Sequence, residues 1–287
     1  GPEAFAEIGV EGYSDHSAMM ACQSLRVYDA GGCCASMSPV QVDAMSLPAP
    51  LAEPRLLPVG DAALTDEFGA SYTPGAAARA RSLDRQLEGQ DGIVERVATL
   101  RSLTIHYDPD RLSLRRLTAL LRDLPPRTET EAEGARWVLP ICYEGEYAPD
   151  LTDLATRLGL SPAEVVAIHA AGRYHAVMVG GYPGYPYLAG LDSRLAAPRR
   201  TTPRIAVPAG SLGVANEFTA IYPQTVPGGW NLIGRTPVPL FDPTRLERPS
   251  LIATGDEVTF RPIPPAEFFA LAEGFRAGAD PVALCAA

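Results

Sequence analysis

The sequence predicts an α+β protein with two domains, a small α/β domain followed by a β-barrel or β-sandwich. Between residues 55 and 143, the patterns follow one another in the order strand, helix, strand, strand, helix, strand. From residue 181 onwards, short apolar runs alternate with Gly and Pro turns, which is typical of barrels and sandwiches. The length of 287 residues also favours two domains, since single cores rarely grow past ~250 residues.

Residues 1–54 differ from the rest of the chain and are predicted to form a leader that is disordered or non-native. They contain seven acidic residues and one Arg, so they carry most of the formal charge of −10. No helical or strand period runs through them, and they lack the basic and apolar regions of a signal peptide. Met45 is a candidate natural start, and a regulatory extension is the alternative interpretation.

The first domain, residues 55–143, is expected to begin with a strand over Ala62–Phe68. A helix follows, because the hydroxyl of Thr73 and the ring of Pro74 form a favoured helix start. This helix ends near Gly89, since glycine commonly terminates helices.

Two strands, a second helix and a last strand complete this domain. Alternating apolar residues predict the strands Ile93–Ala98 and Ser102–Tyr107. Ser113 caps a helix whose leucines form one apolar face, and Trp137–Cys142 is the last strand. The resulting order is that of the split βαβ, ferredoxin-like fold.

Residues 144–180 are expected to form a helical connector into the second domain. Asp150 opens a short helix, and Ser161 with an acidic residue three positions later forms a capping box for a second helix. His169 lies at the end of that helix, where the helix dipole favours a cation. Tyr174–Val179 is then predicted to be a strand that enters the barrel.

The second domain, residues 181–287, contains the segments that indicate chemistry. Four Arg lie in the 11 residues from Arg194 to Arg204, inside an acidic protein. Arg side chains bind carboxylate or phosphate groups through two parallel hydrogen bonds. Further along, Gly228 and Gly229 allow backbone amides to approach a ligand. These segments predict a site for a small anion, and the alternative is a solvated Arg-rich loop.

A C-terminal amphipathic helix is predicted over Pro265–Gly278. Packing on the barrel is its expected use, and partner docking is the alternative.

Composition excludes several function classes. All 24 basic residues are Arg, and a chain without Lys has no P-loop lysine, no Schiff-base amine and no biotin attachment site. The acidic balance argues against nonspecific nucleic-acid binding, and no apolar stretch approaches the ~20 residues of a membrane helix. The five Cys and four His lack metal-ligand spacing, so no metal site is expected. Unpaired thiols indicate a reducing, cytoplasmic compartment.

An ordered series of motifs over residues 55–263 resembles the KipI family. That family includes the B subunit of the prokaryotic 5-oxoprolinase, also labelled allophanate hydrolase subunit 1. It also includes the C/D portion of the urea carboxylase carboxyltransferase domain. The motifs that carry the resemblance are Leu57-Pro58-Val59-Gly60-Asp61, Leu188-Ala189-Gly190-Leu191-Asp192, Val207-Pro208-Ala209-Gly210-Ser211, Ile221-Tyr222-Pro223 and Pro227-Gly228-Gly229-Trp230-Asn231.

The resemblance implies that the barrel is cyclophilin-like, without prolyl isomerase activity. It further implies two partners, a KipA-like chain that forms the C subunit of 5-oxoprolinase, and the A subunit of that enzyme. Together such chains open 5-oxoproline to glutamate at the expense of ATP. Because this chain has no P-loop, ATP is expected to be used by the assembled complex.

Two alternative functions within the resemblance remain open. One is a carboxyltransferase or allophanate hydrolase component of urea metabolism, working on biotin that another chain carries. The other is a non-enzymatic inhibitor of a sensor histidine kinase.

The resemblance and the Arg-rich segment together suggest nine site residues. Four are predicted to hold the carboxylate or a phosphorylated intermediate, or to hydrogen-bond the ligand: Arg200, Arg204, Arg235 and Ser211. Five are predicted to bind the substrate, the glycine amides by stabilising negative charge on the amide oxygen and the aromatic rings as walls: Tyr222, Gly228, Gly229, Trp230 and Thr236.

Two segments depart from the family pattern, Asn216-Glu217-Phe218-Thr219-Ala220 and Tyr182-Pro183-Gly184-Tyr185-Pro186-Tyr187. The added carboxylate and bulk of Glu217 and Phe218 are expected to alter the ligand. The choice between 5-oxoproline and allophanate or urea therefore stays open.

Overall fold

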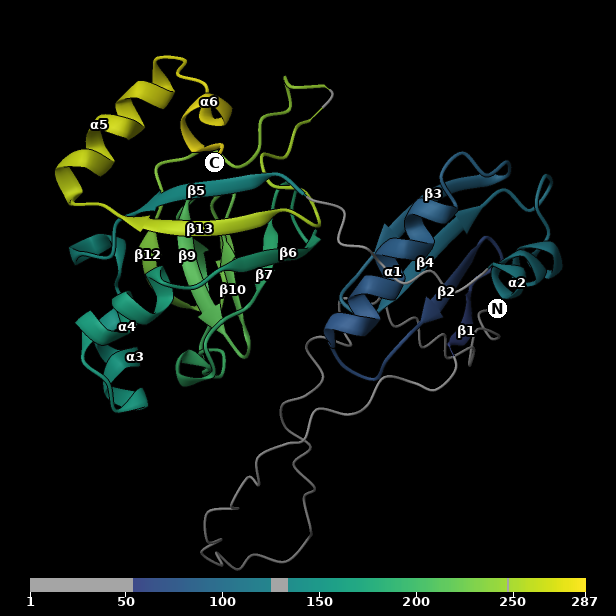
Figure 1. The fold of residues 1–287 in the computed structure, drawn as a ribbon, viewed down its shortest axis with the longest axis horizontal. Helices are drawn as coiled ribbons and strands as arrows, with labels where there is room; N and C mark the ends of the chain where they lie inside the picture. Colours follow the sequence, from purple (N-terminus) through teal and green to yellow (C-terminus); the bar gives the residue numbers. More distant parts are fainter. Residues whose placement is uncertain (1–53, 125–133, 247) are drawn as a thin grey trace, which may run out of the picture. The chain divides into compact units, whose positions relative to one another are not determined.

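The computed structural model describes residues 54–124, 134–246 and 248–287. The predicted leader therefore lies, apart from Pro54, outside the described residues. The described chain has a mixed α+β architecture with two main sheets (Figure 1).

The first sheet has four antiparallel strands in the order β1-β2-β4-β3 (Figure 1). Its strands are β1 (Arg55–Val59), β2 (Ala63–Glu67), β3 (Ile93–Ala98) and β4 (Ser102–Tyr107). Two helices, α1 (Pro74–Gln86) and α2 (Leu114–Asp123), share a core with the sheet that includes Leu64, Leu83, Leu103 and Leu117. The predicted strands that form β2, β3 and β4 and the two predicted helices are confirmed, and Thr73 caps α1 as predicted.

The predicted last strand of this domain belongs to the other sheet. It forms β5 (Arg136–Ile141), which pairs in parallel with β13 (Glu257–Pro262). Instead, β1, which the sequence analysis did not predict, pairs with β2 at the edge of the first sheet. The assignment of Trp137–Cys142 to the first domain was therefore wrong, and the predicted end of that domain at residue 143 falls too late. The observed element order, β1-β2-α1-β3-β4-α2, also differs from the predicted ferredoxin-like order of strand, helix, strand, strand, helix, strand.

The second sheet has seven strands in the order β12-β9-β10-β7-β6-β13-β5, which curve into a nearly closed barrel (Figure 1). Besides β5 and β13, its strands are β6 (Tyr174–Val179), β7 (Pro186–Ala189), β9 (Ser211–Ala215), β10 (Phe218–Ile221) and β12 (Asn231–Arg235). Cys142 and Arg235 exchange backbone hydrogen bonds of 2.8 and 2.9 Å, which join the two edges of the sheet. The barrel prediction is thus confirmed, and the cyclophilin-like subtype stays a prediction.

A two-stranded ribbon and several helices accompany the barrel. The ribbon pairs β8 (Arg204–Val207) with β11 (Val226–Gly228). The connector forms two helices as predicted, α3 (Leu151–Leu158) and α4 (Pro162–Ala170), and α4 carries the capping box at Ser161. The remaining elements are the 3₁₀ turns η1 (Gly145–Tyr147) and η2 (Ser193–Leu195) and the helices α5 (Pro265–Arg276) and α6 (Pro281–Cys285).

The C-terminal helix α5 lies against the barrel, as expected. Its Phe268 packs in a cluster with Cys142 and Ile263, while Phe269 on the outer face is 58 % exposed. The apolar face of this amphipathic helix therefore packs against the barrel of the same chain.

A chain of buried hydrogen bonds crosses the barrel interior at His169. Its Nδ1 lies 2.9 Å from the Tyr143 hydroxyl, and its Nε2 lies 3.1 Å from the Thr219 hydroxyl. Since Thr219 donates to the Gly213 carbonyl, Nε2 carries the proton and Nδ1 accepts from Tyr143. Burial lowers the pKa of His169 to about 3, so the ring is neutral. The interpretation of His169 as a helix C-terminal cation was wrong.

Acidification is expected to destabilise the fold through His169. In the unfolded chain a histidine titrates near pH ~6.5, so below that pH the unfolded chain takes up a proton that the buried ring accepts only near pH 3. This contribution to stability is fully present above pH ~6.5. It falls by about 1.4 kcal/mol per pH unit as the pH is lowered towards about 3.

Urea unfolding at several values between pH 7 and 5 measures this dependence. We expect His169→Gln to show a shallower pH slope of the unfolding free energy than the wild type. The control His175→Gln, which replaces an exposed histidine, should keep the wild-type slope. Equal slopes in His169→Gln and the wild type would show that His169 is not the group responsible.

Candidate functional site

Two arginines of the Arg-rich segment direct their side chains to one buried carboxylate. Arg200 Nη1 donates to Asp150 Oδ1 over 2.8 Å, and Arg204 Nη2 donates to the same oxygen over 2.6 Å. The other oxygen, Oδ2, accepts the backbone N–H of Leu232 over 2.7 Å. The Asp150 side chain is 4 % exposed, whereas those of Arg200 and Arg204 are 35 % and 27 % exposed. The carboxylate is therefore an internal anchor for two arginine side chains that are only partly exposed.

Both guanidinium groups have donors left over after they bind Asp150. Within the described residues, Arg200 Nε and Arg204 Nη1 are buried nitrogen atoms without a hydrogen-bond partner. A buried donor without an acceptor costs about 1–3 kcal/mol. Two positive charges also face one negative charge here, so the cluster is not neutralised by Asp150 alone. An anion with two or more acceptor oxygens, such as a carboxylate or phosphate group, fits these donors.

The Gly228-Gly229 turn lies beside the two arginines. The Arg200 N–H donates to the Gly229 carbonyl over 2.7 Å, and Arg204 pairs with Gly228 where β8 meets β11. A Cβ atom at Gly228 would lie 2.4 Å from the Tyr222 hydroxyl oxygen, so packing alone requires glycine there. At Gly229 the nearest atoms would be 3.7 Å away, which is an ordinary contact. The structure thus explains Gly228 by its packing, and Gly229 has no such constraint.

Tyr222 and Trp230 belong to a buried aromatic cluster next to this turn. The Tyr185 ring lies 5.1 Å from that of Tyr222 and 6.4 Å from that of Trp230. Burial raises the pKa of the Tyr222 hydroxyl. Arg199 lies over the Trp230 ring at 5.7 Å. Because Tyr222 and Trp230 are only 2 % and 5 % exposed, they support the turn from inside.

The remaining three predicted residues, Arg235, Ser211 and Thr236, lie at or beside the C-terminal end of β12. Arg235 follows Asn231 by four positions, about 13 Å along a strand that rises ~3.3 Å per residue. Its Nε donates to a backbone carbonyl over 2.8 Å, and its guanidinium lies 6.0 Å from the Phe268 ring. Ser211 is paired with Arg235, and Thr236 follows it. The structure does not bring these three residues together with Arg200 and Arg204.

Sequence reasoning missed Asp150 as a site residue. It occupies the N-cap position of α3, but its carboxylate makes no capping hydrogen bond. An Asp at a helix start is usually explained by capping, so the sequence carries no signal for a second role. Its side-chain partners lie 50, 54 and 82 residues further along the chain.

Asn231 was also missed, and it holds the neighbouring backbone in place. Its Nδ2 donates to the carbonyls of Pro198 and Val214, both over 3.0 Å. Its Oδ1 accepts from Arg157 Nη2 over 2.7 Å. Asn231 therefore links the start of β12 to the Arg-rich segment and to α3.

The departures from the family pattern lie in a turn and in the aromatic cluster. Asn216 and Glu217 connect β9 to β10, and Asn216 adopts a φ of 53°, which asparagine tolerates better than most residues. Glu217 is exposed on this turn, while Phe218 is buried. Tyr185 and Tyr187 pack against one another at 5.1 Å.

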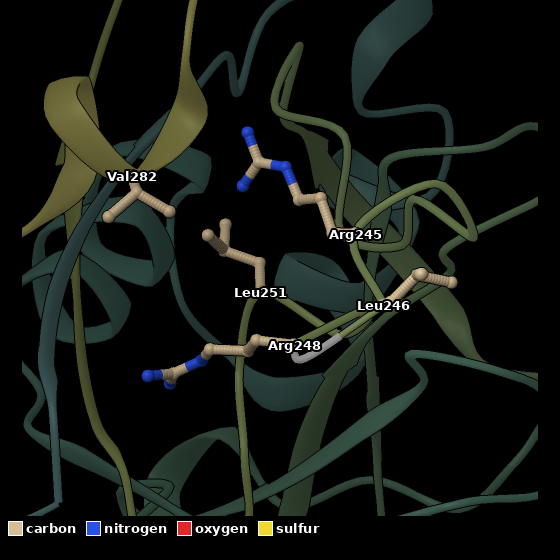
Figure 2. A pocket seen from close by; sticks show the side chains of 5 residues that line it. All are labelled: Arg245, Leu246, Arg248, Leu251 and Val282. Atoms are coloured by element: carbon tan, nitrogen blue, oxygen red, sulfur yellow. The ribbon is translucent and has the colours of Figure 1, made fainter.

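A cavity of about 310 Å³ lies elsewhere, beside α6 (Figure 2). It is lined by Arg245, Leu246, Arg248, Leu251 and Val282, and none of the nine predicted site residues lines it. Figure 2 shows the two guanidinium groups on opposite sides of Leu251. Arg245 binds Asp280 over 2.5 Å and Arg248 binds Asp256 over 2.8 Å, so both already have carboxylate partners. We assign no ligand to this cavity.

Two further properties concern the described residues alone. They contain no group of three or more His, Cys, Asp or Glu side chains that could hold a metal ion. None of their helices is long and apolar enough to cross a membrane.

Residues 54–252 match the family model described as the carboxyltransferase domain, subdomain C and D. Among curated proteins, the 5-oxoprolinase B subunit of Bacillus subtilis (strain 168) is 37 % identical over 230 residues, which cover 75 % of this chain and 95 % of the relative. The 5-oxoprolinase B subunit of Escherichia coli O157:H7 is 36 % identical over 205 residues, which cover 71 % of this chain and 94 % of the relative.

Solved structures show a similar fold within longer chains. The crystal structure of TTHA0988 is 38 % identical with a TM-score of 0.63, and the match covers 70 % of this chain and 40 % of that chain. The Kluyveromyces lactis urea carboxylase is 20 % identical with a TM-score of 0.65, and the match covers 79 % of this chain and 24 % of that chain. The second likeness concerns the fold alone.

Proposed function

The chain belongs to the family of the carboxyltransferase domain, subdomain C and D, and to its branch of 5-oxoprolinase B subunits; from this premise we propose that it is the B subunit of a multi-subunit, ATP-dependent 5-oxoprolinase. In this proposal it works in the cytoplasm with two partners, a KipA-like chain that forms the C subunit, and an A subunit. The assembled complex hydrolyses 5-oxoproline to glutamate, and this chain is active only with its partners.

The unpartnered donors of Arg200 and Arg204 are the observation that carries the proposal. 5-Oxoproline has one carboxylate, whose two oxygens match guanidinium donors in number and charge. In the proposed complex, the two arginines bind this carboxylate and so orient the ring. The amide of Gly229 then stands next to the ring carbonyl, where it stabilises the negative charge that develops on the oxygen.

The far end of β12 has a separate place in this proposal. A ligand as small as 5-oxoproline cannot reach both Arg200 and Arg235, because Arg200 binds Asp150 and Gly229 near the start of β12, whereas Arg235 ends that strand. We therefore propose that Arg235, Ser211 and Thr236 do not bind the same carboxylate as Arg200 and Arg204. They stay predictions for a second group of the reaction, such as a phosphorylated intermediate.

ATP supplies the free energy for ring opening when it is bound to the complex. The residues of this chain do not fit a P-loop ATP site, because the sequence has no Lys. We therefore propose that one of the partner chains binds ATP, and we assign no step on this chain to it.

Reconstitution of the three purified subunits tests the proposed function. We expect 5-oxoproline-dependent release of glutamate and ADP from the complete mixture, and loss of both products when this chain is omitted. A mixture that hydrolyses ATP with urea and a biotinylated partner, but not with 5-oxoproline, would instead support the urea carboxyltransferase function. Absence of 5-oxoproline turnover in the complete mixture would overturn the proposal.

A further inference from the structure

We propose that Asp150 is a positioning residue that sets the geometry of Arg200 and Arg204 for the carboxylate of the substrate. This inference rests on the proposed function, because it assigns a role within the same site. It concerns a residue whose sequence position indicates only a helix cap.

Asp150 is held in place independently of any ligand. Its backbone N–H donates to the Leu232 carbonyl over 3.0 Å, while its Oδ2 accepts the Leu232 N–H over 2.7 Å. Both the backbone and the side chain of Asp150 are thus tied to the start of β12. Its side chain does not make the capping hydrogen bond that an Asp at this position usually makes. The carboxylate is committed to β12 and the arginines.

The shared oxygen Oδ1 brings two like charges together. Arg200 and Arg204 donate to it over 2.8 and 2.6 Å, so their guanidinium groups lie next to one another. Without a carboxylate between them, two guanidinium groups repel, and their long side chains gain rotamer freedom by moving to solvent. Asp150 keeps them side by side, while each retains a donor that has no partner among the described residues. The two guanidinium groups are therefore already positioned to bind one further anion.

A purely structural role of Asp150 has different consequences. If Asp150 served only to join α3 to β12, its replacement would lower stability and affect all ligands of the site alike. If it positions the arginines, its replacement would weaken the binding of a carboxylate in particular. Binding of a ligand that lacks the negative charge of the carboxylate distinguishes the two roles.

The test uses the assembled complex of all three subunits with Asp150→Asn, Asp150→Glu and the control Asp153→Asn. Asn keeps the size of the side chain and an acceptor for Leu232, but it removes the charge and places an N–H₂ donor against other donors. Asp153 lies in the first turn of the same helix, is 64 % exposed and pairs with Arg157. KM and kcat are measured for 5-oxoproline, and the neutral amide of 5-oxoproline is measured as an inhibitor.

We expect Asp150→Asn to raise KM for 5-oxoproline about tenfold to a hundredfold, with kcat changed less than the KM. The inhibition constant of the neutral amide should stay within about twofold, Asp150→Glu should recover part of the affinity, and Asp153→Asn should match the wild type. An unchanged KM in Asp150→Asn, or an equal loss for the neutral amide, would overturn the inference while the proposed function stands. A wild-type complex without turnover would overturn both.

Discussion

Replacement of Arg204 by alanine is expected to lower kcat/KM of the assembled complex for 5-oxoproline by about thirtyfold or more. Loss of one partner from a desolvated charge pair typically costs about 2–5 kcal/mol, and each 1.4 kcal/mol is a factor of ten. Arg204→Ala removes a donor group that faces the proposed carboxylate, and it also removes one of the two guanidinium groups on Asp150. Steady-state kinetics with varied 5-oxoproline measure the effect.

Arg194→Ala is the matched control for this variant. Arg194 lies in the same Arg-rich segment, but its side chain is 62 % exposed and it binds Asp192. We expect its kcat/KM to stay within about twofold of the wild type. Thermal unfolding of both variants shows whether each remains folded, since Asp150 keeps Arg200 and the Leu232 N–H as partners in Arg204→Ala. A folded Arg204→Ala complex with wild-type kcat/KM would remove Arg204 from the site.

Replacement of Asp256 by alanine is expected to destabilise the barrel by about 3–5 kcal/mol. Its buried carboxylate accepts four hydrogen bonds of 2.8–2.9 Å, from the Ala135 and Ala253 amides, Trp137 Nε1 and Arg248 Nη2. Alanine would leave two backbone N–H groups and an indole N–H without an acceptor. For a domain of this size, the loss corresponds to a decrease in Tm of roughly 6–20 °C.

Asp242→Ala provides the comparison for this effect. Asp242 accepts hydrogen bonds from Thr244 and pairs with Arg245, but its side chain is 44 % exposed, so water can replace the carboxylate. We expect its unfolding free energy to change by less than about 1 kcal/mol. Urea unfolding of the two variants at pH 7 measures the difference. Equal stabilities would show that the contacts of Asp256 do not stabilise the barrel.

Much of the secondary structure could be predicted because its signals are local. The hydroxyl of Thr73 accepts the Ala76 N–H over 3.0 Å, and Ser161 exchanges hydrogen bonds with Glu164. These contacts involve residues three positions apart, so the residue types at that spacing are enough to predict them. The same holds for the predicted strands β3 and β4, whose bounds the structure reproduces.

The missed strands lack such local signals. In β1 only Leu56 is partly buried and the other four residues are exposed. Pro58 also interrupts the segment, which therefore shows no alternation of apolar and polar residues. The sequence analysis also predicted no strand at β9, where all five residues are buried, so alternation of apolar and polar residues is absent there too. Each is a strand because of its partners in the sheet, and partners are not visible in a short window of sequence.

The candidate site shows the same division. The Arg-rich segment and the Gly228-Gly229 turn could be recognised from composition, and the structure brings them together through Arg200 and Arg204. Composition could not show that Arg235 lies apart from them. Arg235 belongs to the same sequence motif as the Gly228-Gly229 turn, and only the structure shows that β12 separates the two. Asp150 could not be found either, since its partners come from distant parts of the chain.

The sequence by itself determined the family, the absence of lysine chemistry and the helices with local caps. It also predicted an anion site at the Arg-rich segment, because charge and residue type do not depend on the fold. Only the tertiary structure decided that β5 joins β13, since Ala135 and Asp256 meet across 121 residues of chain. It also decided that Asp150 lies between Arg200 and Arg204, because a buried carboxylate is stable only where the fold brings donors to it.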